Sequence, residues 1–153
     1  MQMNLRIYGM PGHLIRRLQQ HSNHAFYLHA KSAGIDLTSV QFAALDAIRD
    51  NPGIDQAGVS ALIAYDRPTI GGVIERLEAK GLVERKVSPK DRRAREISLT
   101  QMGEALYGEF LPVVRDLQND VLKGLTEDEQ ETFMRLARKV LDASAGSQGE
   151  AEA

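Results

Sequence analysis

The chain has 153 residues, 42% of them hydrophobic and 26% charged, and no cysteine, which excludes disulfides, thiolate metal sites and cysteine nucleophiles. No apolar run approaches the roughly 20 residues of a membrane span and no signal peptide opens the chain, so we expect one globular, cytoplasmic domain. The net charge of -2 is uneven, with +1 in residues 1–65, +4 in residues 66–95 and -7 in residues 96–153, and one basic segment is typical of a protein that places one face on phosphate.

The first long helix is predicted between Pro11 and Ser32. Residues 1–10 have no clear hydrophobic period, and we expect them to form a flexible end. From Pro11 onward, partly apolar residues recur in two neighbouring stripes, and Ala33-Gly34 closes the pattern. Two stripes indicate a helix that is buried on more than one side, as in a dimer interface.

Two shorter helices follow. Thr38 and Gln41 have the spacing of a capping box for the first of them, and Asn51-Pro52-Gly53 ends it. Its core stripe is Phe42, Leu45 and Ile48. Asp55 can cap the second short helix, which extends to about residue 62. The inward face of that helix is predicted to hold Val59, Leu62 and Ile63.

Residues 66–99 form a helix that runs directly into a hairpin. Asp66 is a strong N-cap, Pro68 is tolerated in the first turn, and Gly81 ends the helix in the left-handed conformation. Residues 82–87 and 94–99 then read as two strands around a basic turn at residues 88–93. The buried helix face has the expected spacing in Ile70, Val73, Ile74 and Leu77.

The outward face of this helix is short, polar and basic, and it includes two adjacent glycines. Each glycine costs a helix roughly 1 kcal/mol relative to alanine, which points to close approach, to tight packing or to a lack of selection. Such a helix start suits a DNA major groove, and arginines on a hairpin tip suit the adjacent minor groove. The alternative is a solvated helix with an ordinary charged hairpin. The outward residues are Arg67, Thr69, Gly71, Gly72, Glu75 and Arg76.

Two long helices are predicted in the C-terminal part. Thr100 caps the first, which runs to about Lys123 with Pro112 inside it. Thr126 and Glu129 form a capping box for the second, which runs to about residue 142. Residues 143–153 are mainly Ala, Gly, Ser, Gln and Glu, which cannot bury enough surface to order themselves, so we expect a flexible end.

These elements predict a mainly α (α+β) fold, a winged helix-turn-helix with long N- and C-terminal dimerisation helices. We assign residues 35–99 to the winged helix-turn-helix DNA-binding domain. Residues 11–34 and 100–142 form the helical dimerisation region, because their apolar seams exceed the needs of one small domain. A two-fold homodimer would place two recognition helices on a palindromic site.

Residues 69–85, TIGGVIERLEAKGLVER, and residues 88–100, SPKDRRAREISLT, resemble the multiple antibiotic resistance regulator (MarR) family. The resemblance extends over residues 11–142 by helix pattern and length. It implies a homodimeric winged-helix transcription factor and not an enzyme. Most members are repressors that a small molecule releases from DNA, so the resemblance implies DNA, a second copy of the chain and an effector as partners.

The resemblance also places DNA contacts on the recognition helix. The family's base-reading positions fall on Arg67, Pro68 and Thr69, although Pro68 cannot donate and can only shape the helix start or touch a thymine methyl. Further along, Arg76, Arg85 and Lys86 are either phosphate contacts or members of internal ion pairs. The predicted DNA-binding residues are Arg67, Pro68, Thr69, Gly71, Arg76, Lys90, Arg92 and Arg93.

In the wing, the family's Asp-x-Arg motif falls on Asp91 and Arg93. The resemblance implies that Asp91 orients the wing and that the arginine enters the minor groove. Arg92 is a second candidate for that arginine, because the sequence does not say which of the two points towards DNA.

The absence of cysteine excludes the oxidant-sensing branch of the family, so a bound effector is the natural signal. Family pockets lie between the first helix, the start of the second and the DNA-binding domain. The first helix carries arginines and histidines without an acidic residue, which suits a small aromatic carboxylate gripped by an arginine fork. Alternatively, these are solvated charges and satisfied interface histidines. The candidate effector-binding residues are His13, Arg16, Arg17, His21, His24, Tyr27, Phe42 and Tyr65.

Other functions are weighed against this interpretation. An enzyme or metal protein is disfavoured because no phosphate loop, nucleophile elbow or His-Glu-x-x-His spacing occurs, and His21 with His24 would supply only two ligands. We therefore expect no cofactor. A winged helix that binds an acidic protein partner, or a regulator without a small-molecule effector, remains the alternative. The sequence leaves open repression or activation, the operator and the effector.

Overall fold

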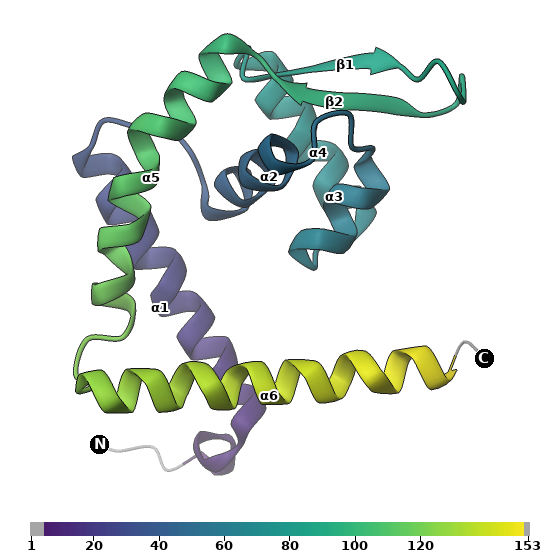
Figure 1. The fold of residues 1–153 in the computed structure, drawn as a ribbon. Coiled ribbons are helices and arrows are strands. Elements are labelled where there is room, and N and C mark those ends of the chain that lie inside the picture. The colour runs from purple at the N-terminus through teal and green to yellow at the C-terminus, as the bar shows by residue number, and fades with distance from the viewer. Residues whose placement is uncertain (1–4, 152–153) are drawn as a thin grey trace. The chain divides into compact units, whose positions relative to one another are not determined.

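The computed structural model describes residues 5–151 of the chain (Figure 1). The elements within these residues are η1, a 3₁₀ turn (Arg6–Gly9), α1 (Pro11–Ser32), α2 (Ser39–Asp50), α3 (Gln56–Ile63), α4 (Arg67–Ala79), β1 (Val83–Val87), β2 (Arg95–Leu99), α5 (Gln101–Val121) and α6 (Glu127–Ala151). The chain divides into two compact units, residues 1–117 and 118–153. Across the described part of the chain, no helix is long and apolar enough to cross a membrane.

Side-chain caps fix where the helices begin, as the sequence predicts. Thr38 accepts from the amide of Gln41 at 3.2 Å while the Gln41 side chain accepts from the Thr38 amide at 3.0 Å, which completes the capping box of α2. Asp55 caps α3 by accepting from the amide of Gly58 at 2.8 Å. The remaining predicted caps, at Asp66, Thr100 and Thr126, are also made.

The winged helix-turn-helix is built from α2, α3, α4 and the hairpin. The two strands pair antiparallel from Val83 opposite Leu99 to Val87 opposite Arg95, and Ile54 forms a bridge with Ile97. Gly81 has φ of +76° and lets the chain leave α4 directly into β1. Fully buried apolar side chains from all these elements form one core, so the predicted fold class is confirmed. They include Leu45, Ile48, Val59, Ile70, Ile74, Leu77 and Ile97.

An aromatic cluster attaches this domain to α1 and α5. Phe42 of α2 stacks on Tyr107 of α5 at 5.4 Å and meets Phe26 of α1 at 6.4 Å, measured between ring centroids. The Tyr107 hydroxyl donates to Asp46 at 2.5 Å. Burial, and then this hydrogen bond to Asp46, raise the pKa of Tyr107 to about 12. The cluster fixes α2 between the two long helices of this unit.

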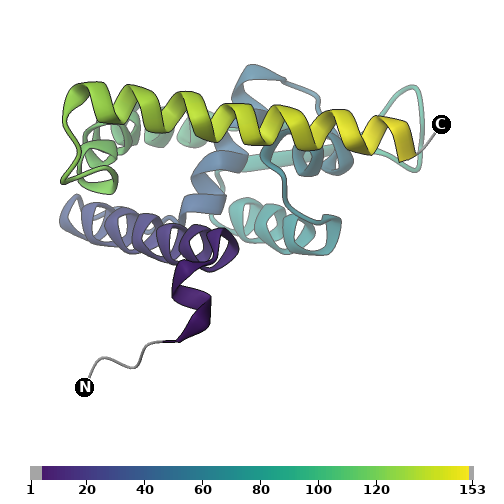
Figure 2. The same ribbon diagram turned by 90° about the horizontal axis from the view of Figure 1, so that it is seen from below.

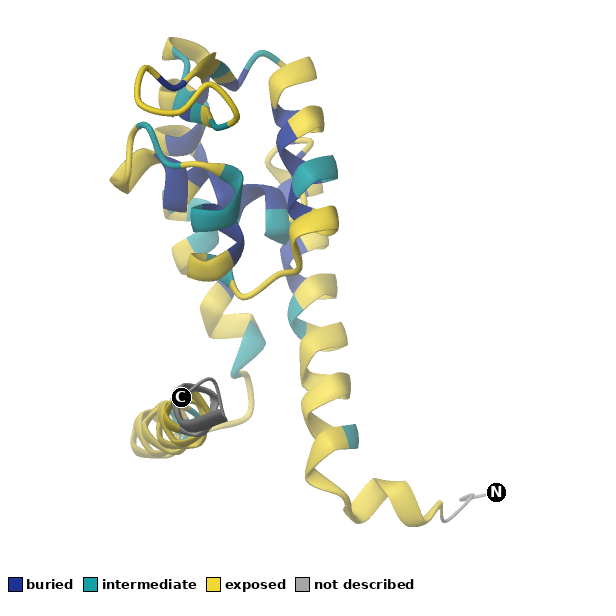
Figure 3. Cartoon of the chain, turned by 90° about the vertical axis from the view of Figure 1, so that its right-hand side faces the viewer, coloured by how far each residue is buried: buried dark blue, intermediate teal, exposed yellow. Residues whose placement is uncertain are grey.

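Large apolar side chains remain exposed along the long helices. In the N-terminal half of α1 the exposed fractions of Leu14 and Ile15 are 48% and 60%. On α6 those of Val140 and Leu141 are 64% and 66%. Figure 3 shows the same contrast, with buried residues in the winged-helix part and on the adjoining parts of α1 and α5, and exposed ones along α6 and the start of α1.

The structure corrects the predicted ends of the chain. The last helix does not end near residue 142 but continues to Ala151, because a helix that has already started gains a backbone hydrogen bond with each added residue and needs no burial for that. Within the first ten residues, 6–9 form η1, which turns away from the start of α1 in Figure 2. Residues 1–4 and 152–153 of the predicted flexible ends lie outside the described residues.

The structure also corrects the predicted inward position of Leu62, which is exposed. Its exposed fraction is 59%, whereas Val59 and Ser60 are buried. The short helix α3 packs against both α2 and α4, so its buried face is set by two neighbours and includes Ser60 in place of Leu62.

Candidate nucleic-acid interface and ligand crevice

The start of α4 exposes a short polar surface. Asp66 accepts from the amide of Thr69 at 2.9 Å and from its hydroxyl at 2.7 Å. These two bonds lower the pKa of Asp66. Because the hydroxyl proton of Thr69 is committed to Asp66, this side chain presents its methyl group and its oxygen as an acceptor. Arg67, Pro68 and Thr69 are all exposed, as a base-reading role would require.

The two adjacent glycines of α4 have different explanations. A Cβ at Gly71 would lie 3.1 Å from the side-chain nitrogen of Gln56, so Gly71 allows α3 and α4 to pack closely. The same Gln56 nitrogen donates to the carbonyl of Arg67 at 3.1 Å. A Cβ at Gly72 would meet no atom within 4 Å. Internal packing therefore explains Gly71, whereas the bare backbone at Gly72 is explained by nothing inside the described part of the chain.

The wing turn is shaped by Asp91. Its carboxylate accepts from the amide of Arg93 at 2.9 Å, and its carbonyl accepts from the amide of Ala94 at 3.1 Å. Arg92 and Arg93 are both exposed on this turn, as is Lys90. This geometry agrees with a wing-orienting role for Asp91.

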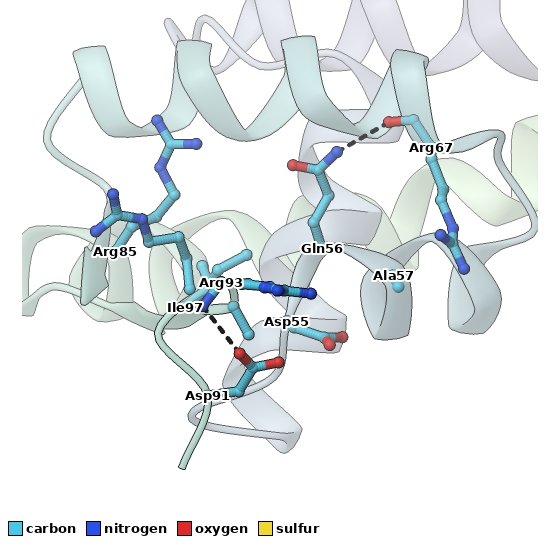
Figure 4. A pocket seen from close by; sticks show the side chains of 10 residues that line it. Asp55, Gln56, Ala57, Arg67, Arg85, Asp91, Arg93 and Ile97 are labelled. Carbon is cyan, nitrogen blue, oxygen red and sulfur yellow. Dashed lines mark hydrogen bonds between the residues drawn. The ribbon is translucent and has the colours of Figure 1, made fainter. Parts of the chain in front are cut away.

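A cleft of about 330 Å³ lies between the start of α3, the start of α4 and the wing (Figure 4). Arg67 and Arg93, which are far apart in sequence, both line it. Neither Lys90 nor Arg92 does. The charged lining also includes Arg85, Arg95, Asp55 and Asp91. Arg67 and Arg93 place one cation from α4 and one from the wing beside the same cleft, which suits an extended polyanion better than a small one.

The arginines and lysines of this segment fall into two classes. The guanidinium of Arg85 grips the Glu78 carboxylate through contacts of 2.9 and 3.2 Å, and this pairing lowers the pKa of Glu78. Lys86 pairs with Glu84 at 3.3 Å. The sequence allows either a phosphate contact or an internal ion pair for Arg85 and Lys86, and in the structure each of them forms an internal ion pair. Arg76 is exposed and has no carboxylate partner within the described part of the chain.

A second crevice, of about 370 Å³, lies between α1, the start of α2 and α4. Tyr27, Tyr65 and Arg76 are among the residues that line it. Asn23 and Ser39 supply polar groups: the Ser39 hydroxyl donates to the Asn23 carbonyl at 3.0 Å. The Asn23 amide NH₂ donates to no group in the described residues. Aromatic walls with one cation and a few polar groups are the usual composition of a small-ligand site.

Only part of the predicted effector set lines this crevice. Tyr27 and Tyr65 do lie at the crevice, but Phe42 is buried in the aromatic cluster. The other five candidates do not line it, and they are His13, Arg16, Arg17, His21 and His24. The crevice begins at Asn23, and at 1.5 Å per residue Arg17 lies about 9 Å nearer the start of α1. His24 follows Asn23 directly but is turned about 100° around the helix.

Neither Asn23 nor Ser39 is among the residues predicted from the sequence, and for Arg76 the sequence offers a phosphate contact or an internal ion pair but no place beside a ligand. The crevice joins α1 to α4 across more than forty residues of chain, and no periodicity within one helix reveals such a pairing. The polar residues at the start of α2 were a usable signal for Ser39, because the family pocket is expected to include the start of the second helix.

Similarity to known proteins over most of the chain decides its family. A MarR family model matches residues 35–94, and the chain is 36% identical over 132 residues to the transcriptional regulator HosA of Escherichia coli O111:H-. That match covers 86% of this chain and 94% of HosA. The chain belongs to the MarR family. It is 34% identical to the transcriptional repressor NicR of Pseudomonas putida, over 86% of this chain and 82% of NicR.

Solved MarR-family structures agree with this fold. BpsR of Bordetella bronchiseptica, whose DNA binding is regulated by 6-hydroxynicotinic acid, superposes with a TM-score of 0.82 at 33% identity, covering 90% of this chain and 97% of BpsR. PcaV of Streptomyces coelicolor with its natural ligand gives 0.77 at 35% identity, with 92% and 97% covered. A mutant MarR of E. coli complexed with operator DNA gives 0.80 at 30% identity, with 90% and 99% covered. The chain is thus a MarR-family transcription regulator, as the relatives named here are.

Proposed function

We propose that this MarR-family regulator is a homodimeric repressor that binds a palindromic operator and leaves it when a small aromatic carboxylate enters the crevice. The observation that carries the proposal is the position of the crevice. Its walls come from α1 and α2 on one side and from the recognition helix α4 on the other. A ligand there contacts the element that reads DNA.

Support for DNA binding comes from the exposed start of α4 and from the wing. Arg67, Pro68 and Thr69 would meet bases in the major groove, while Arg93, or Arg92, would enter the minor groove. Lys90 and Arg76 would contact phosphates. The similarity to MarR bound to its operator supports the same docking mode.

Support for the homodimer comes from the exposed apolar residues of α1 and α6. In a homodimer these exposed apolar residues would pack against the same residues of the second copy, and the two-fold axis would pair two recognition helices. Residues 11–34 and 100–142 would then form the dimerisation region around the DNA-binding residues 35–99. Light scattering at micromolar concentration should give twice the chain mass.

Support for the effector class comes from the tyrosines, the cation and the free amide of the crevice. An aromatic ring fits between tyrosine walls, a carboxylate fits the guanidinium, and a ring hydroxyl or nitrogen fits the polar groups of Asn23 and Ser39. BpsR responds to a pyridine carboxylate of this kind, and NicR is a repressor.

The test is fluorescence anisotropy with labelled DNA from the flank of the protein's own gene. We expect salt-sensitive binding that 4-hydroxybenzoate, 4-hydroxycinnamate or 6-hydroxynicotinate reverses. Arg16→Ala and Arg17→Ala in the same assay decide between a grip on α1 and a grip at the crevice. DNA binding without any acid response would leave a regulator with no such effector. Absence of DNA binding would favour a protein-interaction module.

A further inference from the structure

We infer that Arg76 binds both the DNA and the effector. An effector carboxylate that binds the Arg76 guanidinium would thereby remove one of the cations that hold the DNA. Release would then be a competition for one guanidinium on each chain. This inference rests on the proposed function and names its mechanism. It requires Arg76 to face the DNA side of α4, to line the crevice and to be free of an internal partner.

Arg76 lies on the DNA side of α4. Thr69, Gly72 and Arg76 are three and seven residues apart, so they form one stripe along the helix. Thr69 and Arg76 are exposed, and the backbone at Gly72 between them is bare. The stripe advances about 10 Å from Thr69 to Arg76, at 1.5 Å per residue. A helix whose start is in the groove therefore brings Arg76 near the phosphates that border it.

Arg76 also lines the crevice. Val73, one turn earlier, contributes to the same wall and its exposed fraction is only 4%, so this part of α4 is firmly packed. Arg76 lines the same crevice as Tyr27 and Tyr65. One side chain thus borders both the small-ligand crevice and the surface proposed for DNA.

The guanidinium of Arg76 is available, unlike its neighbours. Arg85 is held by Glu78 at 2.9 Å, Lys80 by Asp36 at 3.4 Å and Lys86 by Glu84 at 3.3 Å. For Arg76 the described residues provide no such pair. Among the described cations of α4 and β1, it is the one that combines crevice access with an unpaired charge.

Competition follows from the geometry of a guanidinium. Its fork of N–H donors matches one carboxylate or one phosphate edge at a time. An acid in the crevice would satisfy that fork and place a negative charge beside the DNA-facing stripe. A neutral analogue would pack between the aromatic walls but leave the Arg76 guanidinium able to bind a DNA phosphate. The charge of the effector, and not its ring alone, would therefore cause release.

The experiment compares Arg76→Gln, Arg76→Lys and Arg93→Ala with the wild type. Calorimetry measures 4-hydroxybenzoate or 6-hydroxynicotinate binding to the DNA-free protein, and anisotropy measures DNA binding across a salt series. Circular dichroism checks that each variant folds. The amide 4-hydroxybenzamide serves as the uncharged analogue of the first acid.

We expect Arg76→Gln to weaken acid binding about 10- to 100-fold, as the loss of a charge-assisted hydrogen bond does. In a dimer it should also reduce the slope of log affinity against log salt by about 1.8, since each lost phosphate contact removes about 0.9. Arg76→Lys keeps the charge but not the fork, so it should retain the salt slope and lose acid affinity. Arg93→Ala should weaken DNA binding and leave acid binding unchanged. The amide should not release DNA.

The outcomes separate this inference from the proposal beneath it. If no aromatic acid binds the wild type, the proposed effector class is wrong. If an acid binds and releases DNA, but Arg76→Gln binds that acid normally or keeps the wild-type salt slope, the shared role of Arg76 is wrong and the proposed function stands. Release of DNA by the amide would likewise overturn the competition.

Discussion

A methyl group added at Gly72 should stabilise the protein and weaken its DNA binding at the same time. The added Cβ would meet no atom within 4 Å, so Gly72→Ala introduces no clash. Alanine is favoured over glycine in a helix interior by about 0.8–1.0 kcal/mol. For a chain of this length, that free energy corresponds to a rise in melting temperature of about 2–4 °C. The same methyl group would stand on the stripe between Thr69 and Arg76, where we place the DNA.

Gly108→Ala in α5 is the matched control, because its Cβ also meets nothing within 4 Å and it lies outside the proposed DNA surface. Both variants should unfold at higher urea concentration than the wild type with an unchanged m-value. Only Gly72→Ala should lose affinity in the anisotropy assay. If both variants bind DNA like the wild type, DNA does not approach Gly72 and the reasoning about the bare backbone is refuted. If Gly72→Ala unfolds earlier than the wild type, the space above it is not free.

Three further outcomes are expected. Gly103→Ala should destabilise the protein by about 1–3 kcal/mol in urea unfolding, because its Cβ would lie 2.0 Å from the backbone oxygen of Leu82, and stability equal to the wild type would contradict this contact. Arg93→Ala should cost about 1–3 kcal/mol of DNA binding without altering the melting temperature, and if Arg92→Ala and Arg93→Ala both bind normally the wing does not touch DNA. Glu78→Gln should be less stable than the wild type at pH 7, because the lowered pKa of Glu78 contributes stability above its ordinary pKa of 4.5. That contribution disappears as the pH falls through the lowered pKa, so the two proteins should converge in acid, and a constant difference down to about pH 2 would exclude the Arg85–Glu78 pair as its source.

Residue chemistry in the sequence determined the elements and most of their boundaries. The Thr38–Gln41 and Thr126–Glu129 boxes, the Asp66 cap and the left-handed Gly81 each act within a few residues of their own position. Such interactions are local, so their spacing along the chain is enough to predict them. The family resemblance rested on the same kind of signal, since the recognition helix and the wing are contiguous in sequence.

Two predictions were wrong: the inward position of Leu62 on α3 and the end of α6 near residue 142. The sequence predicts Leu62 on the inward face of α3, but α3 packs against two helices and buries Ser60 instead. The sequence predicts a flexible end over residues 143–153 because they cannot bury enough surface. In the structure α6 continues to Ala151, since a helix that has already started can continue on backbone hydrogen bonds alone.

Only the tertiary structure decided which charges are paired and which face a cavity. Glu78 lies seven residues before Arg85, and the turn at Gly81 brings the two together, while Arg76 on the same helix has no such pair among the described residues. The crevice draws Asn23 from α1, Ser39 from α2 and Arg76 from α4, whereas the cations at the basic start of α1 do not line it. A ligand site is an enclosure formed by segments that are distant in sequence, and their distances in space depend on the packing of the whole core.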